Sequence, residues 1–308
     1  MRKIVVAGSL NMDLSVRVGH IPAAGETILG GDLLQSAGGK GANQAYAAAK
    51  LAKGVGVTML GCVGRDDFGR EMLRNLASTG CDVSHMDKIA GPSGVALIVV
   101  SEEGENAIVV ASGANFLYSP ERVKHAGVVL DGADTLLLQL EIPLETVKAL
   151  ATAARARGVR VILDPAPVPA SGLPAELLKL ADIITPNETE AMALTGSSDQ
   201  KITPDVAAHM TRELAAKGCG AVILKLGSRG CLVYQGEQAT FIPAPKVEVV
   251  DTTAAGDVFN GALAVALSEG LQLTDACLFA TRAAALSVTR KGAQLSAPSR
   301  EEVNAFHV

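Results

Sequence analysis

The sequence has few basic and few aromatic side chains. Its 308 residues include 27 Lys and Arg against 32 Asp and Glu, which gives a formal net charge of −5. Aromatic residues make up only 3%, and tryptophan is absent. Proteins that bind nucleic acid without sequence preference need a basic surface, and single-strand binders also need rings on which bases stack. The composition therefore excludes this class of function.

Paired cysteines and long apolar runs are lacking too. The cysteines, at positions 62, 81, 219, 231 and 277, are widely spaced and form no CxxC pair. An odd number of cysteines in a long chain argues against a disulfide framework or a zinc site. The apolar run at residues 4–8 is too short for a signal peptide, and no segment approaches the ~18 uncharged apolar residues of a membrane span. We expect a soluble, cytoplasmic protein with reduced thiols and no membrane partner.

Short β-branched runs alternate with alanine-rich helical patterns along most of the chain. The expected strands are residues 3–7, 56–62, 135–140, 159–164, 183–185 and 221–226. The expected helices are residues 41–52, 69–79, 144–157, 188–194 and 205–216, followed by 258–268 and 273–288 after a hairpin at 231–243. Such alternation is typical of an α/β fold with a largely parallel sheet and helices on both faces.

Two segments interrupt this alternation. Residues 12–18 alternate apolar and polar side chains and are followed by a Pro/Gly loop and residues 26–29. Later, residues 94–100 and 106–112 flank a turn and read as a hairpin. Alternation indicates strands with one wet face, so these pieces fit a small antiparallel sheet over the main domain. That sheet is either a lid over a cleft or an ordinary edge hairpin.

The segment DTTAAGD at residues 251–257 lies where a turn leads into a helix. The first amides of a helix lack intrahelical partners and carry the positive end of the helix dipole. Ala254, Ala255 and Gly256 leave those amides unobstructed, so an anion such as phosphate fits there. Asp257 either accepts a proton from an attacking hydroxyl group or is a common acidic residue of a first helical turn.

The segment SAGGKGANQ at residues 36–44 is a glycine-rich turn before a helix. It is not a P-loop, because Gly41 follows Lys40 where that motif needs Ser or Thr. No GxGxxG follows the first strand, which argues against a dinucleotide-dependent oxidoreductase. Clustered glycines let the backbone approach a small polar ligand, with Lys40 and Asn43 at the helix start. A simple strand-to-helix turn is the alternative.

Two further motifs follow expected strands. In TPNETE at residues 185–190, Asn187 and Glu190 lie on one helical face and offer an amide and a carboxylate to a hydrated Mg²⁺. The same pair also fits a capping box, and one residue can do both. The second motif is LGSRG at residues 226–230. Ligands of open α/β sheets bind at the carboxyl ends of strands. The polar or glycine residues expected near such ends are Asn11, Asp13, Lys40, Glu141, Asn187, Gly227 and Asp257.

In this order and spacing, the motifs resemble the ribokinase (PfkB) family of carbohydrate kinases over essentially the whole chain. The segments that carry the resemblance are residues 8–13, 24–27, 38–44, 185–190, 226–230, 251–257 and 288–294. Their GGKGANQ, DTTAAGD and VTRKGAQ sequences are most similar to members that act on ribose rather than on fructose or adenosine. The resemblance implies one three-layer α/β/α domain over residues 1–308, with a mostly parallel central sheet. It also implies a small β-sheet lid from about residues 12–36 and 94–115, and a homodimer formed through that lid.

The resemblance further implies ATP-dependent phosphorylation of D-ribose at the 5-hydroxyl, with Mg²⁺ and an activating K⁺. Asp257 would be the catalytic base, and Ala254, Ala255 and Gly256 would form an anion hole. The sugar would be bound by Asn11, Met12, Asp13, Gly39, Lys40, Gly41, Ala42, Asn43, Glu141 and Asp257. The nucleotide and its Mg²⁺ would be bound by Asn187, Glu190, Lys225, Leu226, Gly227, Ser228, Arg229, Gly230, Gly256 and Thr281. The K⁺ would be held at Asp251, Thr253, Ser287, Arg290, Gly292 and Ser296.

Three positions depart from the family's pattern. Ala255 stands where many members have glycine, which restricts φ in the expected anion hole. Lys225 occupies a strand end that often carries a small or hydroxyl residue, and its side chain either reaches the ATP phosphates or points away. Thr281 lies near the expected adenine pocket.

Two other functions compete with ribose phosphorylation. One is a kinase of the same family for another sugar or a nucleoside. The other is a sugar-binding sensor that kept the fold and lost catalysis. Retention of Asp257, the small-residue turn before it, Asn187 and Glu190 argues against the sensor.

Overall fold

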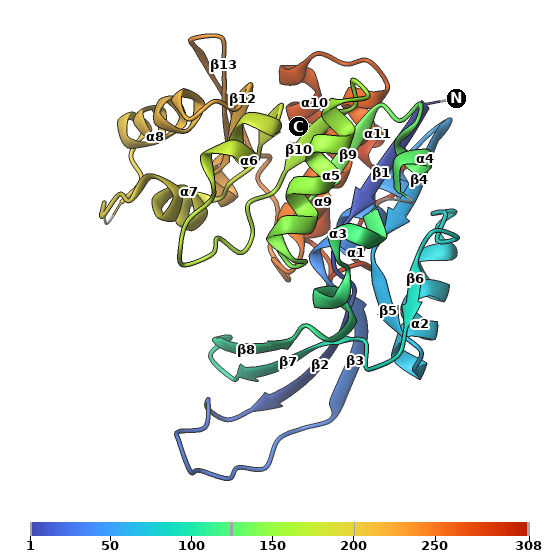
Figure 1. Ribbon diagram of the computed structural model, residues 1–308. Coiled ribbons are helices and arrows are strands. Elements are labelled where there is room, and N and C mark those ends of the chain that lie inside the picture. Colours follow the sequence, from blue (N-terminus) through green and yellow to red (C-terminus); the bar gives the residue numbers. More distant parts are fainter. Residues whose placement is uncertain (1, 124–125, 200, 307–308) are drawn as a thin grey trace.

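The computed structural model describes residues 2–123, 126–199 and 201–306, and its centre is an eight-stranded sheet (Figure 1). The strand order is β14-β13-β12-β11-β10-β9-β1-β4. The bounds are β1 (Arg2–Ala7), β4 (Val55–Leu60), β9 (Thr135–Leu138), β10 (Arg160–Leu163), β11 (Ile183–Ile184), β12 (Ala221–Lys225), β13 (Gly230–Gln235) and β14 (Gln238–Pro243). Strands β12 to β4 pair in parallel, and β13 and β14 extend one edge as an antiparallel hairpin.

Helices cover both faces of this sheet. One face carries α1 (Lys40–Leu51), α2 (Asp67–Ala77), α9 (Ala255–Ser268), α10 (Leu273–Ser287) and α11 (Arg300–Ala305). The other carries α3 (Pro120–Val123), α4 (Ala126–Leu130), α5 (Leu144–Arg155), α6 (Ala175–Leu180), α7 (Glu188–Thr195) and α8 (Pro204–Ala216). In β1, Ile4 and Val6 pack toward the first group of helices, and Val5 and Ala7 toward the second. Because both faces are covered, the strands are apolar without alternation. The three-layer α/β/α prediction is confirmed.

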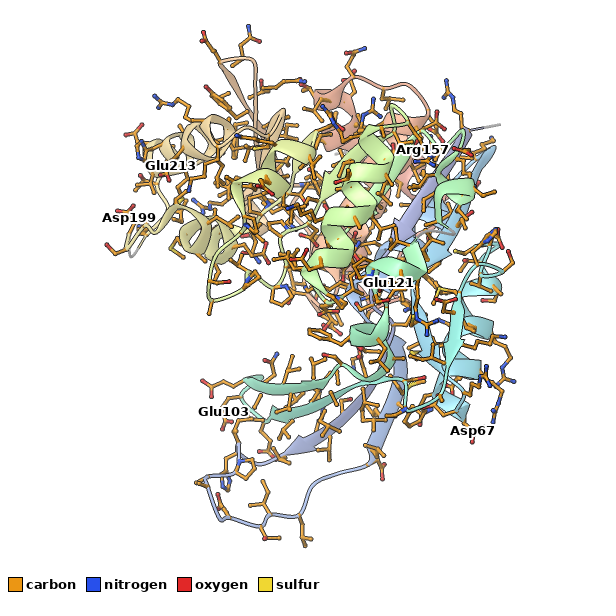
Figure 2. All side chains as sticks on the ribbon, viewed as in Figure 1. Asp67, Glu103, Glu121, Arg157, Asp199 and Glu213 are labelled. Carbon is orange, nitrogen blue, oxygen red and sulfur yellow. The ribbon has the colours of Figure 1, made fainter. Side chains whose placement is uncertain are left out.

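A second sheet of four strands lies apart from these layers (Figure 1). Its order is β3 (Leu33–Gly38), β2 (Asn11–Val18), β7 (Gly94–Ser101) and β8 (Asn106–Ala111). Figure 2 labels Glu103 in the turn that joins β7 to β8. The predicted small sheet is confirmed, but it is mixed rather than antiparallel, because β2 and β7 run parallel.

The expected second piece of this sheet, residues 26–29, is not a strand. The partner of β2 is β3, in a register from Asn11 opposite Gly38 to Val16 opposite Leu33. Glu26 instead closes a loop turn, because its carboxylate accepts hydrogen bonds from the Ala23 N–H and from His20. The loop therefore spans residues 19–32 and extends the small sheet away from the main layers (Figure 1).

The remaining differences are local. The expected strand at residues 56–62 divides into β4 and β5 (Cys62–Gly64), and β5 pairs with the unanticipated β6 (Asp87–Ile89). Two short 3₁₀ helices lie in connections between these elements. Gly113–Leu117 lies between β8 and α3, and Gly227–Arg229 lies between β12 and β13. In the described part of the chain, no helix has the length and apolar character needed to cross a bilayer.

Candidate active site

The candidate site lies at the carboxyl ends of the parallel strands. β1 lies between β9 and β4, so the order of strands reverses direction there. In open α/β sheets such a reversal opens a crevice outside the strand ends. Hydrogen bonds join the segments that follow β1, β9, β10 and β12 to one another and to the starts of α1 and α9.

Asp257 lies buried in the first turn of α9 and is held by two amides from α1. Asn43 Nδ2 donates to Asp257 Oδ2 at 3.0 Å, and Gln44 Nε2 donates to Asp257 Oδ1 at 3.1 Å. Burial raises the pKa of Asp257 to about 6, although the Lys40 ammonium and these two hydrogen bonds favour the charged form. An immobilised carboxylate with a pKa close to neutrality suits a general base.

The start of α9 is open to an anion. Ala254 is the N-cap, with φ 59 and ψ 13, and no side chain caps the helix. An alanine in this left-handed conformation costs roughly 1 kcal/mol relative to glycine. The sequence placed the conformational restriction at Ala255, but Ala255 is the first residue of the helix, and the strained position is Ala254. The turn carries only small residues, and the nearest atom to a Cβ placed on Gly256 would be Lys225 Nζ at 3.4 Å, so an anion has room at the helix start.

The expected sugar-binding side chains come from β2, α1 and the segment after β9. Asn11 Oδ1 accepts from Asn115 Nδ2 at 2.8 Å, and Asn115 also bonds both backbone groups of Leu10. Burial, reinforced by the charges of Glu141 and Asp257, raises the pKa of Asp13 to about 7. These polar groups are fixed before any ligand arrives.

Glu141 and the glycine-rich turn complete this side of the site. Ser9 Oγ donates to Glu141 Oε2 at 2.5 Å, and the Lys40 N–H donates to the same oxygen at 3.3 Å. Gly39 has φ 90, and a Cβ on Gly41 would lie only 2.7 Å from Ser9 N, so both positions require glycine. Close contacts between backbone segments therefore determine the shape of the turn. A simple strand-to-helix connection would not need such contacts.

Two predicted sugar contacts do not reach the site through their side chains. Met12 is fully buried in the hydrophobic core, on the face of β2 opposite to Asp13. Ala42 is buried in the same core, where α1 packs against the sheet. Asn43 differs, because its Oδ1 is buried without a partner among the described residues and can accept from a ligand hydroxyl group.

A cavity of about 740 Å³ borders Gly256, and its lining differs from the sugar-binding residues described above. This volume is in the range of sites for nucleotide-sized ligands. The predicted nucleotide residues that line it are Asn187, Lys225, Gly227, Ser228, Gly230, Gly256 and Thr281. Leu226 instead packs in the core, and Arg229 bonds Glu188 Oε1 and the Ile202 carbonyl, so neither side chain lines the cavity.

Asn187 and Glu190 form the capping box that the sequence allowed. Asn187 Oδ1 accepts from the Glu190 N–H at 2.8 Å, and Glu190 Oε2 accepts from the Asn187 N–H at 2.8 Å. Burial raises the pKa of Glu190. A carboxylate has lone pairs beyond those used here, so the pair also fits a water-coordinated Mg²⁺.

Several residues that the sequence did not predict organise the site. Gln44 Nε2 donates to Asp164 Oδ2 as well as to Asp257, and Gln44 Oε1 accepts from Gln139 Nε2 at 2.6 Å. Asp164 also pairs with Lys225. Gln44 ends the quoted GGKGANQ motif and Asp164 ends an expected strand, and these positions were the available signals. Ser9 lies in the motif at residues 8–13, which is a signal of the same kind, whereas Asn115 has none, because its partners are distant in the sequence.

Comparison with known proteins agrees with this architecture. Residues 1–300 match the family described as pfkB family carbohydrate kinase. The chain belongs to this family. A ribokinase of Haemophilus influenzae is 42% identical over 313 residues, which covers 99% of both chains. A deoxyribokinase of Salmonella typhi is 38% identical, with 98% of both chains covered. The structure of Arabidopsis thaliana ribokinase complexed with ribose and ATP aligns with a TM-score of 0.90, 35% identity and 99% coverage of both chains.

The residues predicted to hold K⁺ lie in two segments, one before α9 and one at or after the end of α10. Asp251 Oδ1 accepts from the N–H and hydroxyl of Thr253, and Asp251 Oδ2 accepts from the Gly292 N–H at 2.9 Å. Although burial alone raises the pKa of Asp251, these hydrogen bonds hold it below its ordinary value. The carboxylate therefore joins residues 251–253 to the loop at 288–292 and stays ionised near the start of α9.

The residues around Asp251 fit a weakly bound, oxygen-coordinated cation. Ser287 and Ser296 are buried, and their hydroxyls donate to the Ala284 and Ala293 carbonyls. K⁺ is coordinated in proteins largely by backbone carbonyl oxygens, so backbone positions of this loop are its expected ligands. The Arg290 side chain pairs with Glu302 in α11, so only its backbone is available to an ion. Within the described ranges, no cluster of three or more His, Cys, Asp or Glu side chains could hold a metal ion.

Proposed function

We propose that this chain transfers the γ-phosphoryl group of ATP to the 5-hydroxyl of D-ribose, giving D-ribose 5-phosphate and ADP. The observation that carries the proposal is the position of Asp257. It lies between the polar groups of β2 and α1 and the cavity at the start of α9. The ribokinase and deoxyribokinase relatives and the ribose- and ATP-bound neighbour support a pentose as acceptor.

On the sugar side, the fixed polar groups would recognise ribose hydroxyls. Asp13 and Glu141 offer carboxylate acceptors, and Asn43 Oδ1 is an acceptor without a partner. An unpaired buried polar group costs ~1–3 kcal/mol, so a sugar that satisfies these groups gains affinity. The pre-formed bonds from Ser9 and Asn115 reduce the ordering that binding requires.

In the transfer step, the 5-hydroxyl oxygen of ribose attacks the γ-phosphorus. A bond forms between these atoms, the bond from the γ-phosphorus to the β,γ-bridging oxygen breaks, and ADP leaves. Asp257 would accept the hydroxyl proton, which adds ~10²–10⁴-fold to the rate. The N–H groups at the start of α9 would stabilise charge on the transferring group, in a transition state that depends mainly on alignment and electrostatics.

Cations would contribute from two places. Asn187 and Glu190 would hold a hydrated Mg²⁺, which would supply positive charge to the transferring phosphate. K⁺ at the Asp251 loop would fix the turn that precedes α9. Activity that is equal in K⁺, Na⁺-only and cation-free buffer would contradict the K⁺ role.

We propose that the main layers form one domain over residues 1–308, with residues 12–36 and 94–115 as a lid. Closure of the small sheet over the sugar would exclude water, which competes with ribose for the phosphoryl group. Leu97 and Val109 are paired across β7 and β8 and are 50% and 66% exposed. Such an apolar surface supports a homodimer formed through the lids. Sedimentation of the wild type and of Val109→Asp tests this, and a monomeric wild type would contradict it.

A sugar panel tests the proposed function. Initial rates of ADP formation would be measured with ribose, deoxyribose, fructose and adenosine at a fixed ATP concentration. We expect the highest kcat/KM with ribose. Preference for deoxyribose would indicate the substrate named for the Salmonella deoxyribokinase. Preference for adenosine would refute the proposal. Binding of ribose without any turnover would identify a sensor.

A further inference from the structure

Lys225 and Asp164 form a buried ion pair inside the candidate site. Lys225 ends β12 and Asp164 follows β10, with β11 between them, so both lie at the same edge of the sheet. Lys225 Nζ lies 3.0 Å from Asp164 Oδ1, and the two side chains are only 14% and 3% exposed. Among the ion pairs of the described residues, this one is the most buried. Removing two charges from water costs free energy that their attraction often does not repay. Stabilisation of the fold is therefore not a sufficient explanation for this buried pair.

The Lys225 ammonium lies against the start of α9. A Cβ placed on Gly256 would be 3.4 Å from Lys225 Nζ, and both residues line the nucleotide-side cavity. An ammonium group has three N–H donors, and Asp164 takes one of them. Lys225 thus brings a positive charge and further donors to the place where the helix start receives an anion.

Asp164 is fixed from two sides. Its Oδ1 accepts from Lys225, and its Oδ2 accepts from Gln44 Nε2 at 2.9 Å. The same Gln44 amide donates to Asp257 Oδ1. A continuous series of contacts therefore runs from Lys225 through Asp164 and Gln44 to Asp257. The flexible lysine stem is held in one geometry relative to the carboxylate that accepts the proton.

We propose that Lys225, positioned by Asp164, binds the terminal phosphate of ATP and stabilises the phosphoryl group during its transfer. This inference rests on the proposed function, since it takes ATP as the phosphate donor. The carboxyl groups in or beside the cleft are Asp13, Glu141, Asp164, Glu190 and Asp257. A polyanion entering among them needs a compensating charge, and Lys225 supplies it at the reacting end. Asp164 is a positioning residue, because it acts on the phosphate only through Lys225.

The opposing explanation is that Lys225 only neutralises Asp164. A double substitution separates the two, because it removes the buried pair without leaving one charge unpaired. Variants Lys225→Met, Asp164→Asn and the double variant would be compared. The matched control removes the Arg300–Glu269 pair at the other end of α9, where the side chains are 18% and 15% exposed and lie outside the site.

Calorimetric titration with ATP and with AMP would be combined with steady-state kinetics. An ionic hydrogen bond to phosphate corresponds to roughly 10- to 100-fold, so Lys225→Met should lower both ATP affinity and kcat/KM for ATP by about that factor. AMP and ribose affinities should stay within about twofold, because Lys225 is expected at the terminal phosphate. The double variant should remain as impaired as Lys225→Met, and the control should keep wild-type kinetics.

Three results would overturn the proposal. Recovery of the double variant to near wild-type rates would show that Lys225 only balances Asp164. Equal loss of ATP and AMP affinity in Lys225→Met would show a role away from the terminal phosphate. Wild-type kinetics in Lys225→Met would remove it from the site. If Lys225→Met fails to fold, the double variant and Lys225→Arg, which keeps the charge in another geometry, carry the test. A wild type that binds ATP in this way but does not phosphorylate ribose would refute the proposed acceptor and leave this inference standing.

Discussion

Replacing Asp257 by asparagine isolates its chemical role from its structural one. In the wild type, both carboxylate oxygens accept hydrogen bonds, from Asn43 Nδ2 and Gln44 Nε2. Asparagine keeps one acceptor oxygen and presents an amide to the other donor. The two side chains have nearly the same size and shape, so one of the two hydrogen bonds is kept and the other is weakened. We therefore expect the variant to keep the site's geometry.

Two opposing free energies set the stability of Asp257→Asn. The pKa of Asp257 is raised from 3.8 to about 6 by burial. Keeping the carboxylate ionised in the folded protein at neutral pH thus costs about 3 kcal/mol, which the amide avoids. One weakened buried hydrogen bond costs ~1–3 kcal/mol in the other direction. The free energy of unfolding should change little at neutral pH. Because the contribution of Asp257 to the wild type's stability falls as pH rises from about 4 to about 6, the variant's relative stability should increase over the same interval.

Catalysis should respond quite differently. Without a base, kcat should fall at least ~10²-fold, while ribose and ATP affinities measured by calorimetry stay close to wild type. Asp67→Asn is a matched control, because Asp67 is an exposed aspartate in the first turn of α2 (Figure 2). Near-normal turnover in Asp257→Asn would remove this residue from the mechanism. A parallel loss of binding and of thermal stability would show that its role is structural.

Three further predictions concern pH, sugar binding and stability. The kcat/KM for ribose should decline below about pH 6, since only ionised Asp257 accepts a proton, and a flat profile down to about pH 5 would contradict this. Asn115→Ala should raise the KM for ribose roughly tenfold and leave the KM for ATP unchanged, because Asn11 and Leu10 lose their partner; equal increases in both would point to general damage. Ser299→Ala removes the capping box of α11 and should lower the free energy of unfolding by ~1 kcal/mol in urea titrations with activity unchanged, and an unaltered midpoint would count against the cap.

The main layers could be predicted because local sequence determines them. Strands buried on both faces are apolar runs, and they alternate with helical patterns that begin at recognisable caps such as Asn187. The ends of those strands then place polar residues at one edge of the sheet. The course of the small sheet could not be derived in the same way. β3 was missed because Leu33 and Leu34 are exposed and the strand is recognised only by its pairing with β2.

The contacts inside the site depend on tertiary register, which local patterns do not encode. The Lys225–Asp164 pair joins two strands separated by a third, and the bond from Ser9 to Glu141 joins the ends of β1 and β9. The position of Lys225 in the sequence does not determine whether its side chain reaches the phosphates. The structure places its ammonium beside Gly256, which makes the question experimental.

The position of the phosphate in the product most directly tests transfer to the 5-hydroxyl of ribose at Asp257. Ribose, ATP and the wild-type chain would be incubated, and the product examined by phosphorus–proton coupling in NMR spectra, with 5-deoxyribose as an acceptor that lacks the reacting hydroxyl. We predict that ribose gives a 5-phosphate and 5-deoxyribose gives no sugar phosphate. Phosphate at another position, or turnover of 5-deoxyribose, would contradict the assignment.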